Sequence, residues 1–145
     1  MKIDDKDWLI LSLLERDGKQ TSQQLADAIH VSSAAVWRRV KALEEAGIIK
    51  GYQAIVDYEV LEQGLTIFVS LTLKRHSADT VRLFEEKVML VDEVLDCYSI
   101  TGQADYILKI RVGAIRDYET VLNDKIFQLP GVDHVQSSIG LREIK

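Results

Sequence analysis

The chain has 145 residues, of which 47% are apolar and 28% charged, and it contains one cysteine. A chain of this composition can bury a core, so wholesale disorder is excluded, and its longest apolar runs fall far short of the ~18 residues that a membrane helix needs. A single cysteine excludes an internal disulfide, and the histidines do not have zinc-ligand spacing. The N-terminus Met1–Asp5 is too acidic for a signal peptide, so we expect a cytoplasmic protein.

The net charge of −5 is unevenly distributed along the chain. Residues 1–51 carry eight of the 18 basic and eight of the 23 acidic side chains, which leaves 10 basic and 15 acidic ones in the remainder. An acidic chain is a poor nonspecific binder of nucleic acid, so a contact with DNA would need a local basic patch. Arg38, Arg39 and Lys41 form such a patch.

Start and stop signals predict three short helices in the first fifty residues. Asp4 is a good N-cap for the first helix. Thr21 and Gln24 have the spacing of a capping box at the start of the second helix, and Ser32 is a good N-cap for the third, which ends at Gly47. The second and third helices are joined by a turn of about three residues, which matches a helix-turn-helix.

The third helix has the pattern of an element that reads DNA. Its apolar stripe of Val36, Val40 and Leu43 faces the core, while small residues at its N-terminal end allow a helix to enter the ~12 Å major groove. Hydroxyl and free N–H groups at its start suit a phosphate, and its basic side chains can reach phosphates or guanine edges. The candidate DNA-contacting residues are Ser32, Ser33, Ala34, Ala35, Trp37, Arg38, Arg39 and Lys41.

Two alternatives stay open for this helix. Its basic side chains could instead pair with Glu44 and Glu45 on a solvated face, and Trp37 could pack on the first helix. The helix-turn-helix frame around the helix favours the DNA-binding interpretation.

After Gly47 the apolar residues alternate with a period of two, which predicts a β-like connector over 48–56. Strands are expected at 66–73, 94–101, 106–112 and 135–144, with one helix from Ser77 or Asp79 through Val88 and another over 114–129. The order β-α-β-β-α-β is that of a ferredoxin-like fold. We therefore predict an α+β protein with a helix-turn-helix domain at 1–51, a β connector at 52–64 and a ferredoxin-like domain at 65–145.

A ferredoxin-like sheet carries both helices on one face and leaves the other face bare. Ile107 on the bare face favours a second subunit as its cover, although Lys109 and Arg111 beside it are also consistent with a solvated face.

The turn Thr101-Gly102-Gln103-Ala104-Asp105-Tyr106 joins the two central predicted strands. Successive N–H groups in a glycine turn bind an anion and a nearby carboxylate binds an ammonium group, so the turn fits both charges of a free α-amino acid. The alternative is ordinary hairpin chemistry, in which Gly102 and Asp105 serve only the turn.

The sequence shows no catalytic arrangement. Its three histidines are scattered, and it has no nucleophile elbow, no glycine-rich phosphate loop and no carboxylate motif. We therefore expect a protein that is not an enzyme and that needs no cofactor or metal, and we interpret Cys97 as a buried small hydrophobe.

Nearly the whole chain resembles the Lrp/AsnC family of bacterial and archaeal transcription regulators. The likeness lies in Ile3-Asp4, Asp7 and Ile10-Leu11, in Gln24-Leu25-Ala26, in the run from Val31 to Ile49, in Thr101–Tyr106 and in Leu129-Pro130-Gly131-Val132. The resemblance implies a winged-helix-like DNA-binding domain and a C-terminal domain, called RAM, that dimerises and commonly assembles four dimers into a ring-like octamer.

The resemblance also implies an amino-acid effector bound between dimers. It maps the effector-binding residues onto Thr101, Gly102, Gln103, Ala104, Asp105, Tyr106, Ser137 and Ser138. Positions 103 and 104 vary among relatives, so they can set the choice of effector without revealing it.

The leading hypothesis is therefore a transcription regulator associated with the nucleoid. It would bind double-stranded DNA at a pseudo-palindromic operator as dimers, and a free amino acid would shift its assembly or its affinity for DNA. The alternatives are an architectural DNA-binding protein without an effector and, from another class, a metabolic enzyme or enzyme subunit.

Overall fold

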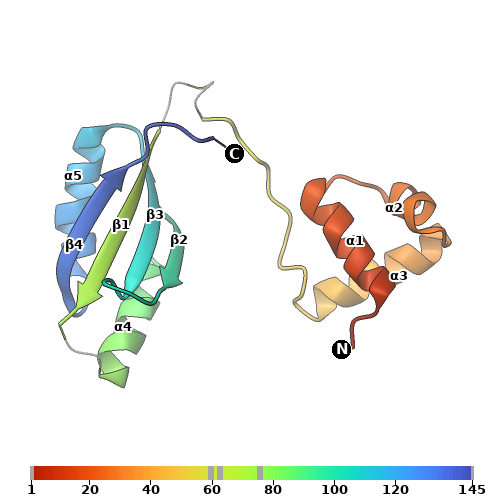
Figure 1. The fold of residues 1–145 in the computed structure, drawn as a ribbon, viewed down its shortest axis with the longest axis horizontal. Helices are drawn as coiled ribbons and strands as arrows, with labels where there is room; N and C mark the ends of the chain where they lie inside the picture. Colours follow the sequence, from red (N-terminus) through yellow and green to blue (C-terminus); the bar gives the residue numbers. More distant parts are fainter. Residues whose placement is uncertain (1, 59–60, 62–63, 75–76, 145) are drawn as a thin grey trace. The chain divides into compact units, whose positions relative to one another are not determined.

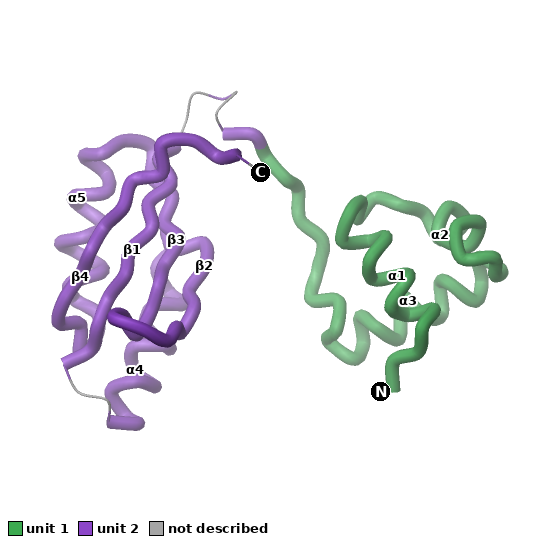
Figure 2. The backbone as a smooth tube through the Cα atoms, viewed as in Figure 1, with its two compact units in different colours: residues 1–56 green, residues 57–145 purple. Residues whose placement is uncertain are grey.

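The computed structural model describes residues 2–58, 61, 64–74 and 77–144. The chain forms two compact units, residues 1–56 and 57–145, shown in different colours in Figure 2. The division falls within the predicted connector 52–64, of which residues 59–60 and 62–63 lie outside the described residues. Among the described residues, no helix combines the length and the apolar character needed to span a membrane.

Unit 1 contains three helices, α1 (Asp5–Arg16), α2 (Ser22–Ile29) and α3 (Ser33–Glu45). The predicted N-caps are all formed: Asp4 and Thr21 each complete a capping box, and the Ser32 hydroxyl accepts a hydrogen bond from the N–H of Ala35. Each cap satisfies an N–H group that the first turn of a helix leaves unpaired, which is why these positions could be assigned from local sequence.

The core of unit 1 joins one face of each helix. Its fully buried members are Ile10, Leu25, Ala26, Val36 and Leu43. The turn between α2 and α3 passes through His30, whose φ of 54° is in the left-handed region, and the N–H of the next residue bonds back to the carbonyl of Ala26. This turn holds α3 across the other two helices with its remaining faces outward.

Unit 2 is a four-stranded antiparallel sheet with helices on one side (Figure 1). Its elements are β1 (Leu65–Leu73), α4 (Ala78–Val88), β2 (Val94–Ser99), β3 (Tyr106–Val112), α5 (Ile115–Asp124), the short 3-10 helix η1 (Ile126–Gln128) and β4 (Val132–Ile139). The strand order β2-β3-β1-β4 confirms the predicted ferredoxin-like topology.

The core of unit 2 lies between the sheet and its two helices. Alternate residues of β1 and β3, such as Val69 and Leu108, are fully buried there against Phe84 of α4 and Val121 of α5. No helix among the described residues of unit 2 covers the opposite face (Figure 1), and Phe68 on that face is 41% exposed. The alternation of buried and exposed side chains along these strands follows from the two-residue period of a β-strand.

Four predicted elements differ from the structure in extent. Residues 48–56, predicted as a β-like connector, form no strand, because they pair with no strand among the described residues. The final strand is 132–139 instead of 135–144: Val132 pairs with Leu73 at one end of β1, and the N–H of Gly140 reaches the carbonyl of Thr66 at the other. Beyond that point only Leu65 of β1 remains.

The last predicted helix is broken at Lys125, where the backbone leaves the helical region and η1 follows. This change of direction accompanies the complete burial of Ile126. The strand predicted at 94–101 ends at Ser99. Cys97 is exposed rather than buried, because β2 is an edge strand of the sheet.

Candidate nucleic-acid interface and ligand loop

The N-terminal end of α3 presents small side chains. The Ser32 hydroxyl is committed to the N–H of Ala35, at 3.3 Å, so it caps the helix. Ala34 is exposed, while Ser33 and Ala35 are half-buried. A surface of this kind lets a partner approach the helix backbone closely.

The exposed face of α3 carries an aromatic ring and two cations. Trp37 is 56% exposed and does not join the core. The ammonium group of Lys41 lies 5.1 Å from the centroid of the Trp37 ring and 3.9 Å from a carboxylate oxygen of Glu45. Arg38 is exposed and makes no ion pair with any described residue. Since an exposed ion pair such as Lys41–Glu45 is weak, Lys41 can leave Glu45 and bind a phosphate. Arg38 can bind a phosphate without breaking an ion pair to any described residue.

Arg39 has a different role from the other two cations. Its Nη1 donates to both carboxylate oxygens of Asp4, at 3.0 and 2.8 Å, and to Oδ1 of Asp7 at 2.7 Å. Asp7 is only 2% exposed. The N–H of Asp7 and, to a lesser degree, the Arg39 guanidinium lower the pKa of the Asp4 carboxyl. Arg39, predicted to reach DNA, is thus bound inside unit 1 and ties α3 to the first turn of α1.

This role of the two aspartates was not predicted. Asp4 was expected only to cap α1, and Asp4 and Asp7 do form its capping box. The signal for a second role was present: Asp7 needs only one of its oxygens for the cap, and a buried carboxylate requires a cationic partner.

Two backbone hydrogen bonds fix the loop between β2 and β3, one within the loop and one to β1. The N–H of Ile100 bonds to the carbonyl of Asp105 at 2.9 Å, and the N–H of Asp105 bonds to the carbonyl of Leu71 at 3.0 Å. Gly102 has a φ of 126°, which side chains rarely adopt. Thr101, Gly102 and Gln103 are exposed and Ala104 is half-buried, so this loop is open to a ligand.

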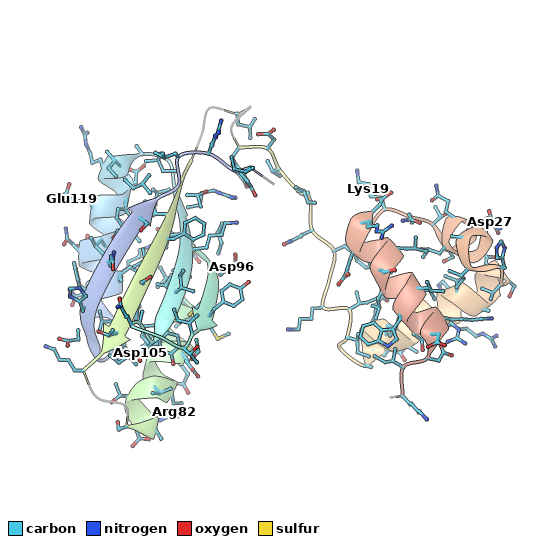
Figure 3. All side chains as sticks on the ribbon, in the orientation of Figure 1. Lys19, Asp27, Arg82, Asp96, Asp105 and Glu119 are labelled. Atoms are coloured by element: carbon cyan, nitrogen blue, oxygen red, sulfur yellow. The ribbon has the colours of Figure 1, made fainter. Side chains whose placement is uncertain are left out.

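Asp105 lies in this loop beside the end of β1 (Figure 3). Its Oδ2 accepts a hydrogen bond of 2.8 Å from the N–H of Leu73. The carboxylate therefore closes the end of the β1 strand, which is a structural role beside any contact with a ligand.

The other predicted ligand residues point to different surfaces. Tyr106 is buried on the helix side, where its hydroxyl donates to Glu85 at 2.9 Å; burial and then Glu85 raise the pKa of Tyr106 to about 12. The Ser137 hydroxyl bonds with that of Tyr118 on the same side. Ser138 pairs with Phe68 and so faces the bare side. One chain by itself therefore does not bring Tyr106, Ser137 and Ser138 together with the loop.

Among the described residues, no group of three or more histidine, cysteine, aspartate or glutamate side chains could hold a metal ion.

Each unit matches a family described from known proteins. Residues 3–50 match a winged helix-turn-helix DNA-binding domain, and residues 66–145 match the Lrp/AsnC ligand binding domain. The second match alone covers more than half of the chain.

Similar proteins match over nearly the full length. The chain is 34% identical to the transcriptional regulatory protein DoeX of Halomonas elongata, over 100% of this chain and 92% of that protein. It is 32% identical to the leucine-responsive regulatory protein of Haemophilus influenzae, over 99% of this chain and 86% of that protein. A crystal structure of a transcriptional regulator in complex with L-Met, from Neisseria meningitidis, has a TM-score of 0.85 and 32% identity, over 99% of this chain and 93% of that one. The chain therefore belongs to the Lrp/AsnC family of transcription regulators, with an N-terminal helix-turn-helix domain for DNA and a C-terminal ligand-binding domain.

Proposed function

We propose that the protein binds a pseudo-palindromic operator as a dimer, through α3 of each subunit, and that a free amino acid modulates this binding. The observation that carries the DNA half of the proposal is the exposed face of α3. Small residues lie at its N-terminal end, and Trp37, Arg38 and Lys41 extend outward from its middle. We propose Ser32, Ser33, Ala34 and Ala35 as the residues that allow close approach to the groove.

A double variant tests this interface. A duplex is first selected from random DNA and footprinted with the wild-type protein. Arg38→Ala with Lys41→Ala is then expected to weaken binding to this duplex about tenfold or more, because two charged contacts are lost. The matched control is Arg16→Ala with Lys19→Ala, which removes two exposed cations at the other end of α1. Unchanged affinity in the first variant, with unchanged circular dichroism, would overturn the assignment of α3.

Specificity distinguishes this function from the architectural alternative. A regulator binds its selected duplex about a thousandfold or more tightly than random DNA at the same salt concentration. An architectural protein would bind both duplexes alike. We propose that the protein is a regulator that works in the cytoplasm on the nucleoid and has no catalytic activity. Turnover of an amino acid by the purified protein would contradict the proposed lack of catalytic activity.

The amino-acid half of the proposal rests on the ligand-binding domain. The loop at 101–105 supports it, because exposed N–H groups in a glycine turn suit a carboxylate and Asp105 suits an ammonium group. Two similar proteins point to amino acids as the ligand class: one is named as leucine-responsive, and another was solved with L-Met. Since one chain separates Tyr106, Ser137 and Ser138 from the loop, we propose that the complete site forms between dimers.

Thermal melts with each of the twenty amino acids test the effector. A ligand that binds only the folded state stabilises it by ~2.7 kcal/mol at a hundredfold excess over Kd, so one amino acid should raise the melting temperature selectively. The variant Asp105→Asn should lose this shift. Asparagine keeps a carbonyl oxygen for the N–H of Leu73, so this variant removes the charge without opening the end of β1. No shift with any amino acid would contradict the effector while leaving the DNA proposal intact.

We also propose that the chain forms homodimers that assemble into an octamer. Two surfaces support a homodimer: the bare face of the sheet with Phe68, and the extended segment before unit 2, where Ile55 is 97% exposed. Burying apolar surface of this kind favours association. Sedimentation equilibrium of the purified protein would give the stoichiometry, and a monomer at micromolar concentration would contradict the assembly.

A further inference from the structure

A hollow of about 410 Å³ lies between the start of α1 and one flank of α3. We call it the α1–α3 hollow. Its lining residues are Lys2, Asp4, Asp7, Ala35, Arg38, Arg39 and Ala42. Four of these, Ala35, Arg38, Arg39 and Ala42, recur at the i, i+3, i+4, i+7 spacing of a single helical face. The hollow therefore borders the face of α3 that we assign to DNA, and no role is yet attached to it.

The charges around the α1–α3 hollow favour an anion. Its two acids are already satisfied, because Asp4 and Asp7 each accept a bond from Arg39 and from the other's backbone N–H. Lys2 and Arg38 have no ion-pair partner among the described residues. Three cations against two carboxylates leave a net charge of +1, and the two unpaired cations are the ones open to a ligand.

The shape of the wall suits an anion that belongs to a large molecule. Ala35 and Ala42 have small side chains, so a large ligand can approach the α3 backbone closely on either side of Arg38. A helix in the ~12 Å major groove has the phosphates of the two DNA strands along its flanks. The anions that this flank of α3 would meet are therefore phosphate diesters.

We propose that the α1–α3 hollow seats a backbone phosphate of DNA, held by Lys2 and Arg38, while Arg39 neutralises Asp4 and Asp7 beside it. This inference rests on the DNA-binding function proposed above. It adds Lys2, which lies outside the helix-turn-helix, to the contact residues. It also gives Arg39 a part in binding without any contact of its own, because two bare carboxylates at this position would repel a phosphate.

The salt dependence of binding tests the seat directly. The slope of log K against log[salt] falls in magnitude by about 0.9 for each phosphate contact that is lost. We expect this change for Lys2→Gln and for Arg38→Gln measured on the selected duplex, and about twice the change for the double variant. The matched control is Lys19→Gln, an exposed lysine beyond the other end of α1 (Figure 3), which should keep the wild-type slope.

The outcomes separate this inference from the function on which it rests. If Lys2→Gln keeps the wild-type slope while Arg38→Gln lowers it, α3 contacts DNA but the α1–α3 hollow is not the seat. If the wild-type protein binds no duplex above the level of random DNA, the proposed function itself fails. Because Lys2 is exposed and precedes the first helix, its substitution should leave the fold intact, which circular dichroism would verify.

Discussion

Arg39 is the residue that joins two helices of unit 1 through charge. Its guanidinium binds Asp4 and the buried Asp7, so its removal leaves a carboxylate inside the domain without a cation. The cost of such a loss is several kcal/mol for a fully buried pair and less here, because 32% of the Arg39 side chain is exposed.

We therefore predict that Arg39→Gln lowers the free energy of unfolding of unit 1 by about 2 kcal/mol. Urea unfolding followed by tryptophan fluorescence measures this unit alone, because Trp8 and Trp37 are the only tryptophans in the chain. Arg38→Gln is the control, and a surface change of this kind should stay within about 0.5 kcal/mol. Equal stability of the two variants would show that Arg39 does not hold α1.

Gly131 is the glycine of unit 2 at which an added side chain has least room. Its φ is +76°, and a Cβ atom there would lie 2.4 Å from Cγ2 of Thr80 at the start of α4. Its carbonyl also accepts a hydrogen bond of 2.7 Å from the N–H of Lys74. A side chain at position 131 therefore requires a shift of either the backbone there or Thr80 on α4.

We predict that Gly131→Ala destabilises unit 2 by about 2 kcal/mol, from left-handed strain of about 1 kcal/mol and a similar steric cost. Thr80→Ser removes only Cγ2 and keeps the hydroxyl that bonds to Ser77. The double variant should therefore recover the steric part and retain the strain. A double-mutant cycle by thermal melting and near-ultraviolet circular dichroism checks this, and strict additivity of the two changes would contradict the clash.

At the scale of elements, an ion pair connects the end of the α5 region to the start of β2. Lys125 donates to both carboxylate oxygens of Glu93 at 2.7 Å. The Lys125 ammonium lowers the pKa of the Glu93 carboxyl, against the opposing effect of its burial. A lowered folded-state pKa stabilises the fold above the ordinary pKa of glutamate, 4.5, and this stabilisation is lost as the pH falls through the folded-state value.

We predict that Glu93→Gln lowers the stability of unit 2 by about 0.5–1 kcal/mol at neutral pH, the range for partly exposed pairs. The difference from wild type should shrink as the pH falls below 4.5 and disappear once the pH is below the lowered folded-state pKa of Glu93, because the wild-type carboxyl is then protonated as well. Thermal melts across this pH range measure it. Glu86→Gln, which breaks an exposed pair with Arg82 on α4, should change the stability little at neutral pH. A constant difference down to acid pH would contradict the role of the Glu93 charge.

At the scale of the whole molecule, we propose that two copies of the chain associate through the bare face of the sheet. Phe68 lies on this face, opposite Lys109 on β3 and Ser138 on β4. Burying its ring against a second copy gains apolar contact, whereas a carboxylate in its place would have to lose its hydration even beside Lys109, which is costly.

We predict that Phe68→Asp converts the assembled protein into monomers in sedimentation equilibrium. Phe127→Asp is the matched control: that ring is 48% exposed on η1, on an element away from the bare face. It should leave the assembly unchanged. Retention of the dimer by Phe68→Asp would place the interface elsewhere.

Much of the fold could be predicted from the sequence because its determinants are local. The caps at Asp4, Thr21 and Ser32 each involve residues three positions apart, so a short window of sequence contains both partners. The alternation along β1 and β3 likewise fixes which side chains are buried once the strands exist. These local patterns determined the helix-turn-helix, the order of the strands and helices, and the family likeness.

The tertiary structure alone decided which distant groups meet. Arg39 is 35 residues from Asp4, and Asp105 is 32 residues from Leu73. The pleat of β4 puts neighbouring Ser137 and Ser138 on opposite faces, and the pairing of β4 with β1 decides that Ser137 is the one on the helix side. A hydrogen bond or ion pair depends on distances of about 3 Å, and the path of the chain, rather than any local pattern, brings such groups within that reach.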